Sequence, residues 1–226
     1  MLNLISQRTV CSIIFFALTQ LMVISVSAQQ KAIRYHEDPN NPCGLIFTKH
    51  YGPFDYRVVQ GVFDNVERFH FTPKVESLVR GESSTLGDDI SYTLLASPNH
   101  VRALIAMERL SERTKKDQPD GAEYPMECYY DRALRFQPDD TVVRALYAIY
   151  LHKHSRNDEA IKQLDVAASY AGNNSLSHYN IGLVYFEVGA YEKALLEAHT
   201  ASRLGWSGIK LEELLKGAGK WRDPAP

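Results

Sequence analysis

Histidine and aspartate residues in the first half of the sequence could form a metal site or an acid/base site. Imidazole and carboxylate groups ligate transition metals and transfer protons. Their spacing matches no metal motif, because no two histidines lie four residues apart. We expect His70 and His100 to be capping or polar surface residues. An enzyme or metal-dependent sensor with a site in residues 43–100 is the alternative hypothesis. The residues concerned are His50, His70 and His100, with Asp55, Asp88 and Asp89.

Three common catalytic motifs are missing from the sequence. It has no Gly-x-Ser-x-Gly elbow, no glycine-rich phosphate loop and no His-Glu-x2-His motif. His152 and His154 lie two residues apart, so a helix would point them in different directions. Cys128 has no histidine near it in sequence that could activate it as a nucleophile. We therefore expect no enzymatic activity, no cofactor and no resident metal.

Residues 1–28 have the features of a secretory signal peptide. Arg8 supplies a positive charge, residues 11–26 form an apolar run, and the sequence SVSA at residues 25–28 has the small-x-small pattern of a cleavage site. A retained membrane anchor is the alternative, although the run is short and interrupted by polar residues. We expect the mature protein to be periplasmic or secreted, with no membrane insertion after cleavage.

Export would leave Cys43 and Cys128 as the cysteines of the mature chain. In an oxidising compartment two thiols can pair in one way, so we predict a disulfide between them. On the chain-entropy model such a bond stabilises the fold by roughly 4 kcal/mol. The alternative is that one or both cysteines are buried free thiols.

The charge of the chain argues against some classes of partner, and its length indicates one domain. The chain of 226 residues has a formal net charge of -2, and its basic residues do not cluster. We therefore expect no nucleic acid and no acidic membrane surface as a partner. The roughly 200 residues after the signal peptide suffice for one domain with a sizeable core.

Residues 141–207 match themselves at an offset of 34. That period, and the run His178-x2-Ile181-Gly182-x2-Tyr185 followed by Ala194-x3-Ala198, resemble the tetratricopeptide repeat. The resemblance implies an all-α solenoid of helical hairpins and a protein-binding scaffold whose ligand it leaves open. The matched pairs are Thr141 and Ser175, Ala148 and Gly182, Leu151 and Tyr185, Ala160 and Ala194, Ile161 and Leu195, and Ala167 and Ala201.

A degenerate unit precedes these two, giving about three repeats. The run Arg-Ala-Leu-x-Ala at residues 102–106 recurs at residues 144–148, and its second half ends at Pro138. The two halves of this unit are out of register by eight residues. We therefore predict an insertion of that length, with the composition of a solvated loop, between residues 114 and 124. The predicted helices of the later units are 141–153, 157–171, 176–188 and 191–204.

The remaining parts are assigned from turn residues and apolar spacing. Turn residues alternate with apolar side chains before residue 58, so we expect an irregular segment that packs against the protein. Helices are expected at residues 55–69, 73–80 and 88–97, the last capped by Asp88. The predicted parts are a signal peptide at 1–28, an irregular segment at 29–57, a helical extension at 58–98, repeats at 99–207, and a capping helix with a tail at 208–226.

The resemblance also implies where the protein binds, because the first helices of tetratricopeptide units line a concave face. An apolar groove of this kind either receives an apolar or helical partner or is filled by the protein's own segment 43–57. We favour self-filling. The function we expect is that of an exported scaffold that mediates protein-protein interaction in the cell envelope, with the partner unknown. The inward side chains would be His100, Ala103, Met107, Leu110, Val142, Ala145, Ile149, His152, Leu176, Tyr179, Leu183 and Phe186.

Overall fold

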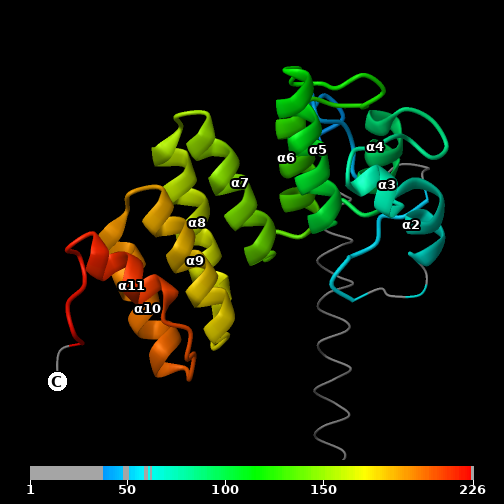
Figure 1. Ribbon diagram of the computed structural model, residues 1–226. Helices are drawn as coiled ribbons and strands as arrows, with labels where there is room; N and C mark the ends of the chain where they lie inside the picture. The colour runs from blue at the N-terminus through cyan, green and yellow to red at the C-terminus, as the bar shows by residue number, and fades with distance from the viewer. Residues whose placement is uncertain (1–37, 48–50, 59–60, 62, 225–226) are drawn as a thin grey trace, which may run out of the picture.

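The protein is described here by a computed structural model that covers residues 38–47, 51–58, 61 and 63–224. The predicted signal peptide and His50 lie outside these residues. All regular secondary structure in the described part is α-helical, as predicted, and none of its helices is long and apolar enough to cross a membrane. Consecutive helices follow one another from one end of the molecule to the other, ending with α11 (Figure 1). The helices are α2 (Asp64–His70), α3 (Pro73–Glu76), α4 (Leu86–Ala96), α5 (Val101–Thr114), α6 (Met126–Phe136), α7 (Thr141–Lys153), α8 (Asn157–Ala171), α9 (Ser175–Glu187), α10 (Tyr191–Arg203) and α11 (Lys210–Gly217).

Helices α7 and α8 form one hairpin, and α9 and α10 form the next. Three residues separate the two helices of each hairpin, and α9 contacts both α7 and α8, so the second hairpin stacks on the first. Ala148, Ala160 and Ala194 are fully buried at these contacts. A Cβ atom on Gly182 would come within 2.5 Å of Leu211 Cδ2. The small residues that repeat at the period of 34 therefore lie where helices approach most closely. The predicted bounds of α7 and α8 are confirmed, and those of α9 and α10 differ by one residue.

Helices α5 and α6 form an earlier hairpin with a longer turn. Eleven residues, 115–125, separate them, which is eight more than in the later hairpins. The predicted insertion is thus confirmed, but its second half is not a free loop. The backbone N–H of Glu123 donates to Ser91 Oγ at 3.1 Å, and the Thr85 hydroxyl donates to the Asp120 carbonyl oxygen at 3.2 Å. These bonds attach the insertion to α4, so it joins the helical extension to the first hairpin.

A capping side chain starts the first helix of each hairpin. A ring nitrogen of His100 accepts a backbone N–H of α5 at 3.1 Å, Asp140 accepts two from α7 at 3.1 Å, and Asn174 accepts one from α9 at 3.0 Å. The caps place α5 40 residues before α7. The sequence match between residues 102–106 and 144–148 predicted that α5 starts 42 residues before α7. The predicted register of the first unit is therefore wrong by two residues.

The helical extension contains shorter helices than predicted. Asp55 begins a turn instead of a helix, because its carboxylate accepts the backbone N–H of Arg57 at 3.0 Å, and α2 starts only at Asp64. Helix α3 has four residues and ends before Leu78, which has a left-handed backbone with φ of 58°. Thr85, and not Asp88, caps α4. Its hydroxyl accepts the Asp88 N–H at 3.2 Å, which leaves Asp88 in the first turn, where its charge favours the helix dipole.

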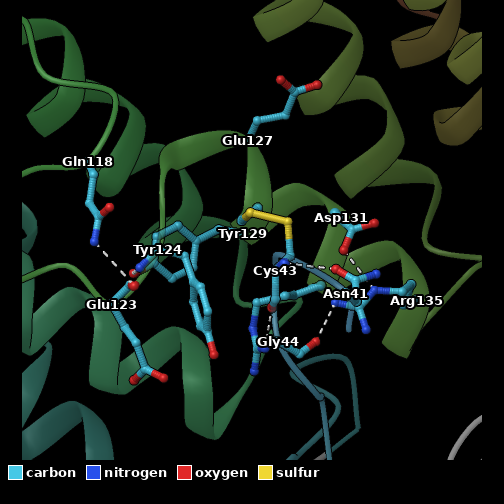
Figure 2. The surroundings of a disulfide bond; sticks show 12 residues. Asn41, Cys43, Gly44, Gln118, Glu123, Tyr124, Glu127, Tyr129, Asp131 and Arg135 are labelled. Atoms are coloured by element: carbon cyan, nitrogen blue, oxygen red, sulfur yellow. Dashed lines mark hydrogen bonds and ion pairs between the residues drawn. A yellow bond between two sulfur atoms is a disulfide. The ribbon is translucent and has the colours of Figure 1, made fainter. Parts of the chain in front are cut away.

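A disulfide ties the N-terminal segment to α6. Cys43 and Cys128 are joined with an Sγ–Sγ distance of 2.04 Å across 85 residues of sequence, as predicted, and Figure 2 shows this bond and its surroundings. Arg132 and Arg135, both on α6, donate to the carbonyl oxygens of residues 43–45 at 2.8 to 2.9 Å. The segment therefore lies against the second helix of the first hairpin.

Asn99 attaches the same segment to the start of α5 and α7. Its fully buried side chain donates to Asp55 at 2.8 Å and to Asp140 at 3.0 Å, and it accepts the backbone N–H of Tyr56 at 3.0 Å. The Tyr56 ring stacks on His100 with centroids 4.0 Å apart. Burial alone would raise the pKa of Asp55, but hydrogen bonds from Arg57 and Asn99 outweigh it and lower that pKa. The segment thus fixes the junction between the first two hairpins.

Helix α11 covers the other end of the stack, as predicted. Leu211 and Leu215 are buried where α11 contacts α9 and α10. Trp221 returns to the fold, with its ring edge-on to His199 at 5.0 Å and beneath the Lys216 ammonium at 5.7 Å. This helix removes the apolar end of α9 and α10 from solvent.

Candidate functional site

A hollow of about 360 Å³ lies between α7 and α9, the first helices of two neighbouring hairpins. Small side chains, Ala145 and Ser177, lie on each of its two walls. Its walls are mostly apolar, and in the described part of the chain no side-chain hydrogen bond or ion pair joins its polar members across it. The lining residues are Val142, Ala145, Leu146, Ile149, Ile181, Leu183 and Val184, with Thr141, Ser177, Asn180 and Glu187 as the polar members. We call this hollow the α7–α9 groove.

Four residues predicted for the concave face line the α7–α9 groove. They are Val142, Ala145 and Ile149 from α7 and Leu183 from α9. Val142 is 47% exposed although it is apolar, and the other three are half-buried. The structure therefore brings together predicted binding residues that lie about 40 positions apart in sequence.

Tyr179 and Leu176 lie outside the groove lining. The Tyr179 ring packs against Trp206 with centroids 4.9 Å apart, and both residues line a separate hollow of about 210 Å³ beside α11. Leu176 is 46% exposed in the first turn of α9. These two residues belong to the same helix as Leu183 but do not share its hollow.

Phe186 and His152 lie at the inner turns of the hairpins. The Phe186 ring packs edge-on against Tyr191 at 5.3 Å, across the turn between α9 and α10. His152 Nδ1 is 2.8 Å from Asn157 Oδ1, across the turn between α7 and α8. Both contacts hold a turn together, and neither residue lines the groove.

His100 and Met107, predicted for the concave face, are fully buried and cannot contact a partner in this structure. The cause is the shift in register of the first unit. Counted from the caps, the α5 residues equivalent to the three groove residues of α7 are Arg102, Ile105 and Arg109, and all three are exposed. Sequence reasoning missed them, although a comparison of the capping positions would have found them. Ala103 and Leu110, from the same prediction, are also buried.

The described part of the segment 43–57 does not fill the α7–α9 groove. None of its residues is in the groove lining. Phe47 packs edge-on against Phe136 at 6.2 Å, and Tyr56 stacks on His100. The disulfide to α6 and the bonds to Asn99 direct the segment along the first hairpin, where its aromatic side chains find their burial site.

An ion-pair network links the neighbouring helices α5 and α7. Lys153 Nζ lies 2.8 Å from carboxylate oxygens of both Glu108 and Glu112. Burial alone would lower the pKa of Lys153, but these hydrogen bonds outweigh it and raise that pKa. Tyr130 donates to Glu108 at 2.5 Å, and burial raises the pKa of its phenol well above the usual value. Ion pairs therefore bridge α5 and α7, whereas a hollow lies between α7 and α9.

The histidines and carboxylates of the extension form separate pairs. His70 Nδ1 lies 2.9 Å from Asp89 Oδ1, and His100 Nε2 lies 3.0 Å from Glu67 Oε1. His100 caps α5 through its other ring nitrogen, which confirms its predicted capping role; burial lowers its pKa despite the bond to Glu67. Within the described residues no three such side chains are placed to hold a metal ion.

Comparisons with known proteins give no family for this chain. The sequence matches no protein-family model, and it has no significant match among curated proteins.

Proposed function

We propose that this protein is an exported, tetratricopeptide-repeat-like scaffold that holds a protein partner of the cell envelope in the α7–α9 groove. The observation that carries the proposal is the open apolar hollow of about 360 Å³ on the first helices of two stacked hairpins. The period of 34 residues and the buried small residues at that period support the repeat resemblance.

Export is supported by the disulfide. Such bonds persist in oxidising compartments and are rare in the cytosol of most organisms. The apolar run of residues 11–26 and the small residues at 25–28 supply a secretory signal. We place the protein in the periplasm or outside the cell.

The groove's chemistry favours a partner that inserts an apolar side chain. Burial of one side chain of the size of leucine or phenylalanine contributes about 1.5–3 kcal/mol. That is too little for stable binding alone, so the partner must also contact the surrounding surface. Asn180 and Glu187 border the groove and are exposed, so they can bond to a partner's polar groups.

Aspartate substitutions in the groove test this proposal. Val142→Asp places a carboxylate among the apolar walls, and it lies in the first turn of α7, where a negative charge favours the helix. The matched control is Leu196→Asp, because Leu196 is 62% exposed on α10. Affinity capture from the envelope fraction should lose a specific partner with the first variant and keep it with the second. Equal capture by a folded Val142→Asp protein contradicts binding in the groove.

A metal-dependent sensor or enzyme in residues 43–100 is the second candidate function. The His70–Asp89 pair favours it, because a carboxylate that orients a histidine is common to metal and acid/base sites. Asp89 is also held by the backbone N–H groups of residues 82–84, at 2.7 to 3.3 Å. Metal analysis of the purified protein and of His70→Ala tests this candidate. Substoichiometric metal in both proteins, with no effect of the substitution beyond stability, contradicts it.

A further inference from the structure

A hollow of about 400 Å³ lies on α5, beside the turn that follows α3. It has a polar and positive character, unlike the α7–α9 groove. Arg109 and Arg113 are one helical turn apart and both line it. The other lining residues are Ser77, Leu78 and Glu112. We call this hollow the arginine hollow.

The carboxylates around the arginine hollow are already paired with other cations. Glu112 bonds to Lys153 at 2.8 Å. Glu76 bonds to Arg102, and that hydrogen bond lowers the pKa of Glu76. Arg109 makes no hydrogen bond or ion pair within the described chain. Within the described residues neither guanidinium group of the hollow forms an ion pair with a carboxylate, although the charge of Arg109 contributes to the lowered pKa of Glu76.

Arg113 is held in place by an unusual backbone. Its Nη1 donates to the carbonyl oxygen of Leu78 at 2.7 Å. Leu78 is buried and has a left-handed backbone with φ of 58°, a conformation that is unfavourable for a residue with a Cβ atom. The bond fixes one N–H of the guanidinium and leaves the others for a ligand. Fixing an arginine in advance reduces the entropy lost on binding.

The arginine hollow lies on the helix that continues the series of first helices. Counted from the helix caps, Arg109 is equivalent to Ile149 of the α7–α9 groove. A partner that lies across the first helices would therefore meet an apolar hollow on one side and two exposed guanidinium groups on the other, one of them bonded to the Leu78 carbonyl oxygen. Guanidinium groups bind carboxylates through two parallel hydrogen bonds.

We propose that Arg109 and Arg113 bind the carboxylates of an acidic segment of the protein partner. This inference rests on the proposed function, because it names the chemistry of the same partner. The partner would present an apolar side chain to the α7–α9 groove and aspartate or glutamate side chains to the arginine hollow. Binding at the hollow should weaken with salt, because both arginines are exposed.

Peptide binding measured by fluorescence anisotropy at low ionic strength tests this inference. The probes are a labelled pentaglutamate peptide with an amidated C-terminus and its pentaglutamine analogue. We expect the glutamate peptide to bind and the glutamine peptide not to bind. Arg109→Gln/Arg113→Gln should weaken binding about fivefold or more, the size of two partly screened ion pairs. Lys162→Gln/Arg203→Gln, which removes the same charge from α8 and α10, should change it less than about twofold.

Two results would overturn the inference. One is equal binding of the glutamate peptide by wild type and the Arg109→Gln/Arg113→Gln variant, and the other is a failure of wild type to prefer glutamate over glutamine. If the double variant does not fold, pentaglutamate binding by Arg109→Gln alone is compared with that of wild type. This single variant should fold, because the Arg109 side chain makes no hydrogen bond or ion pair within the described residues. Val142→Asp separates this inference from the proposed function. It should change pentaglutamate binding by less than about twofold, because Val142 does not line the arginine hollow. Retention of the envelope partner by that variant contradicts only the groove.

Discussion

Removal of the disulfide should destabilise the protein without unfolding it. The Cys43→Ala/Cys128→Ala variant opens a loop of 85 residues. The chain-entropy model gives a loss of about 4.5 kcal/mol for a loop of this length, and measured losses are often smaller. For a protein of this size each kcal/mol corresponds to roughly 2–4 °C in melting temperature, so we expect a fall of about 9–18 °C at most.

Other contacts should keep the variant folded. Ile46 is 2% exposed, Arg132 bonds to the segment's carbonyl oxygens, and Asn99 bonds to Asp55, all without the disulfide. These contacts stabilise the folded state in the reduced protein as well. The helical signal of the variant should therefore equal that of wild type at low temperature.

The assay is urea unfolding followed by circular dichroism, with wild type measured with and without reductant. Reduced wild type and the cysteine variant should unfold at the same urea concentration, well below that of oxidised wild type. A difference between oxidised and reduced protein of less than about 1 kcal/mol, near the uncertainty of the extrapolation, would refute the reasoning.

Three further substitutions test the packing, the caps and the buried network. Gly182→Leu should lower the free energy of unfolding by about 1–3 kcal/mol in urea melts, because its side chain would collide with Leu211, whereas Gly217→Ala, with no atom near its Cβ, should not. Burial lowers the pKa of His100, so as the pH falls the unfolded chain binds the proton first, and the free energy of unfolding should decrease below about pH 6.5. His100→Asn, which keeps a capping oxygen, should make the free energy of unfolding from urea melts less dependent on pH below about 6.5. Asn99→Ala should cost about 1–3 kcal/mol in thermal melts, because it leaves buried polar partners unsatisfied; an unchanged melting temperature contradicts the role of this network.

The later hairpins could be predicted from the sequence because their geometry depends on local spacing. Small residues must recur where helices cross, and Ala148 and Gly182 do so at the period of 34. The turns are short, so the position of one helix fixes the next. The disulfide was also predictable, since the predicted removal of residues 1–28 would leave a single possible pairing.

The register of α5 in the first unit could not be predicted from the sequence match alone. The run at residues 102–106 resembles that at 144–148, but α5 begins two residues away from the position that this match implies. Two residues correspond to roughly 200° around an α-helix, so the prediction selected the buried side of α5. His100 shows the physical reason: a histidine caps this helix, where aspartate and asparagine cap the others.

The burial site of the N-terminal segment depends on contacts distant in sequence. Its apolar side chains indicated that it must pack somewhere, but not where. The structure places it by Cys128 and Arg132 on α6 and by Asn99 before α5, 43 or more residues away. A sequence pattern contains no signal for such pairs, and the arginine hollow was missed for the same reason, because Leu78 and Arg113 meet across 35 residues.

Site-specific photo-crosslinking tests the central claim most directly. A photoreactive phenylalanine analogue replaces Ile149 in the α7–α9 groove or, as the control, Leu196 on the exposed side of α10. We predict that position 149 forms one discrete adduct in the envelope, that position 196 does not, and that Val142→Asp abolishes the adduct. An adduct that forms equally at both positions, or that persists with Val142→Asp, would contradict a partner held in the groove.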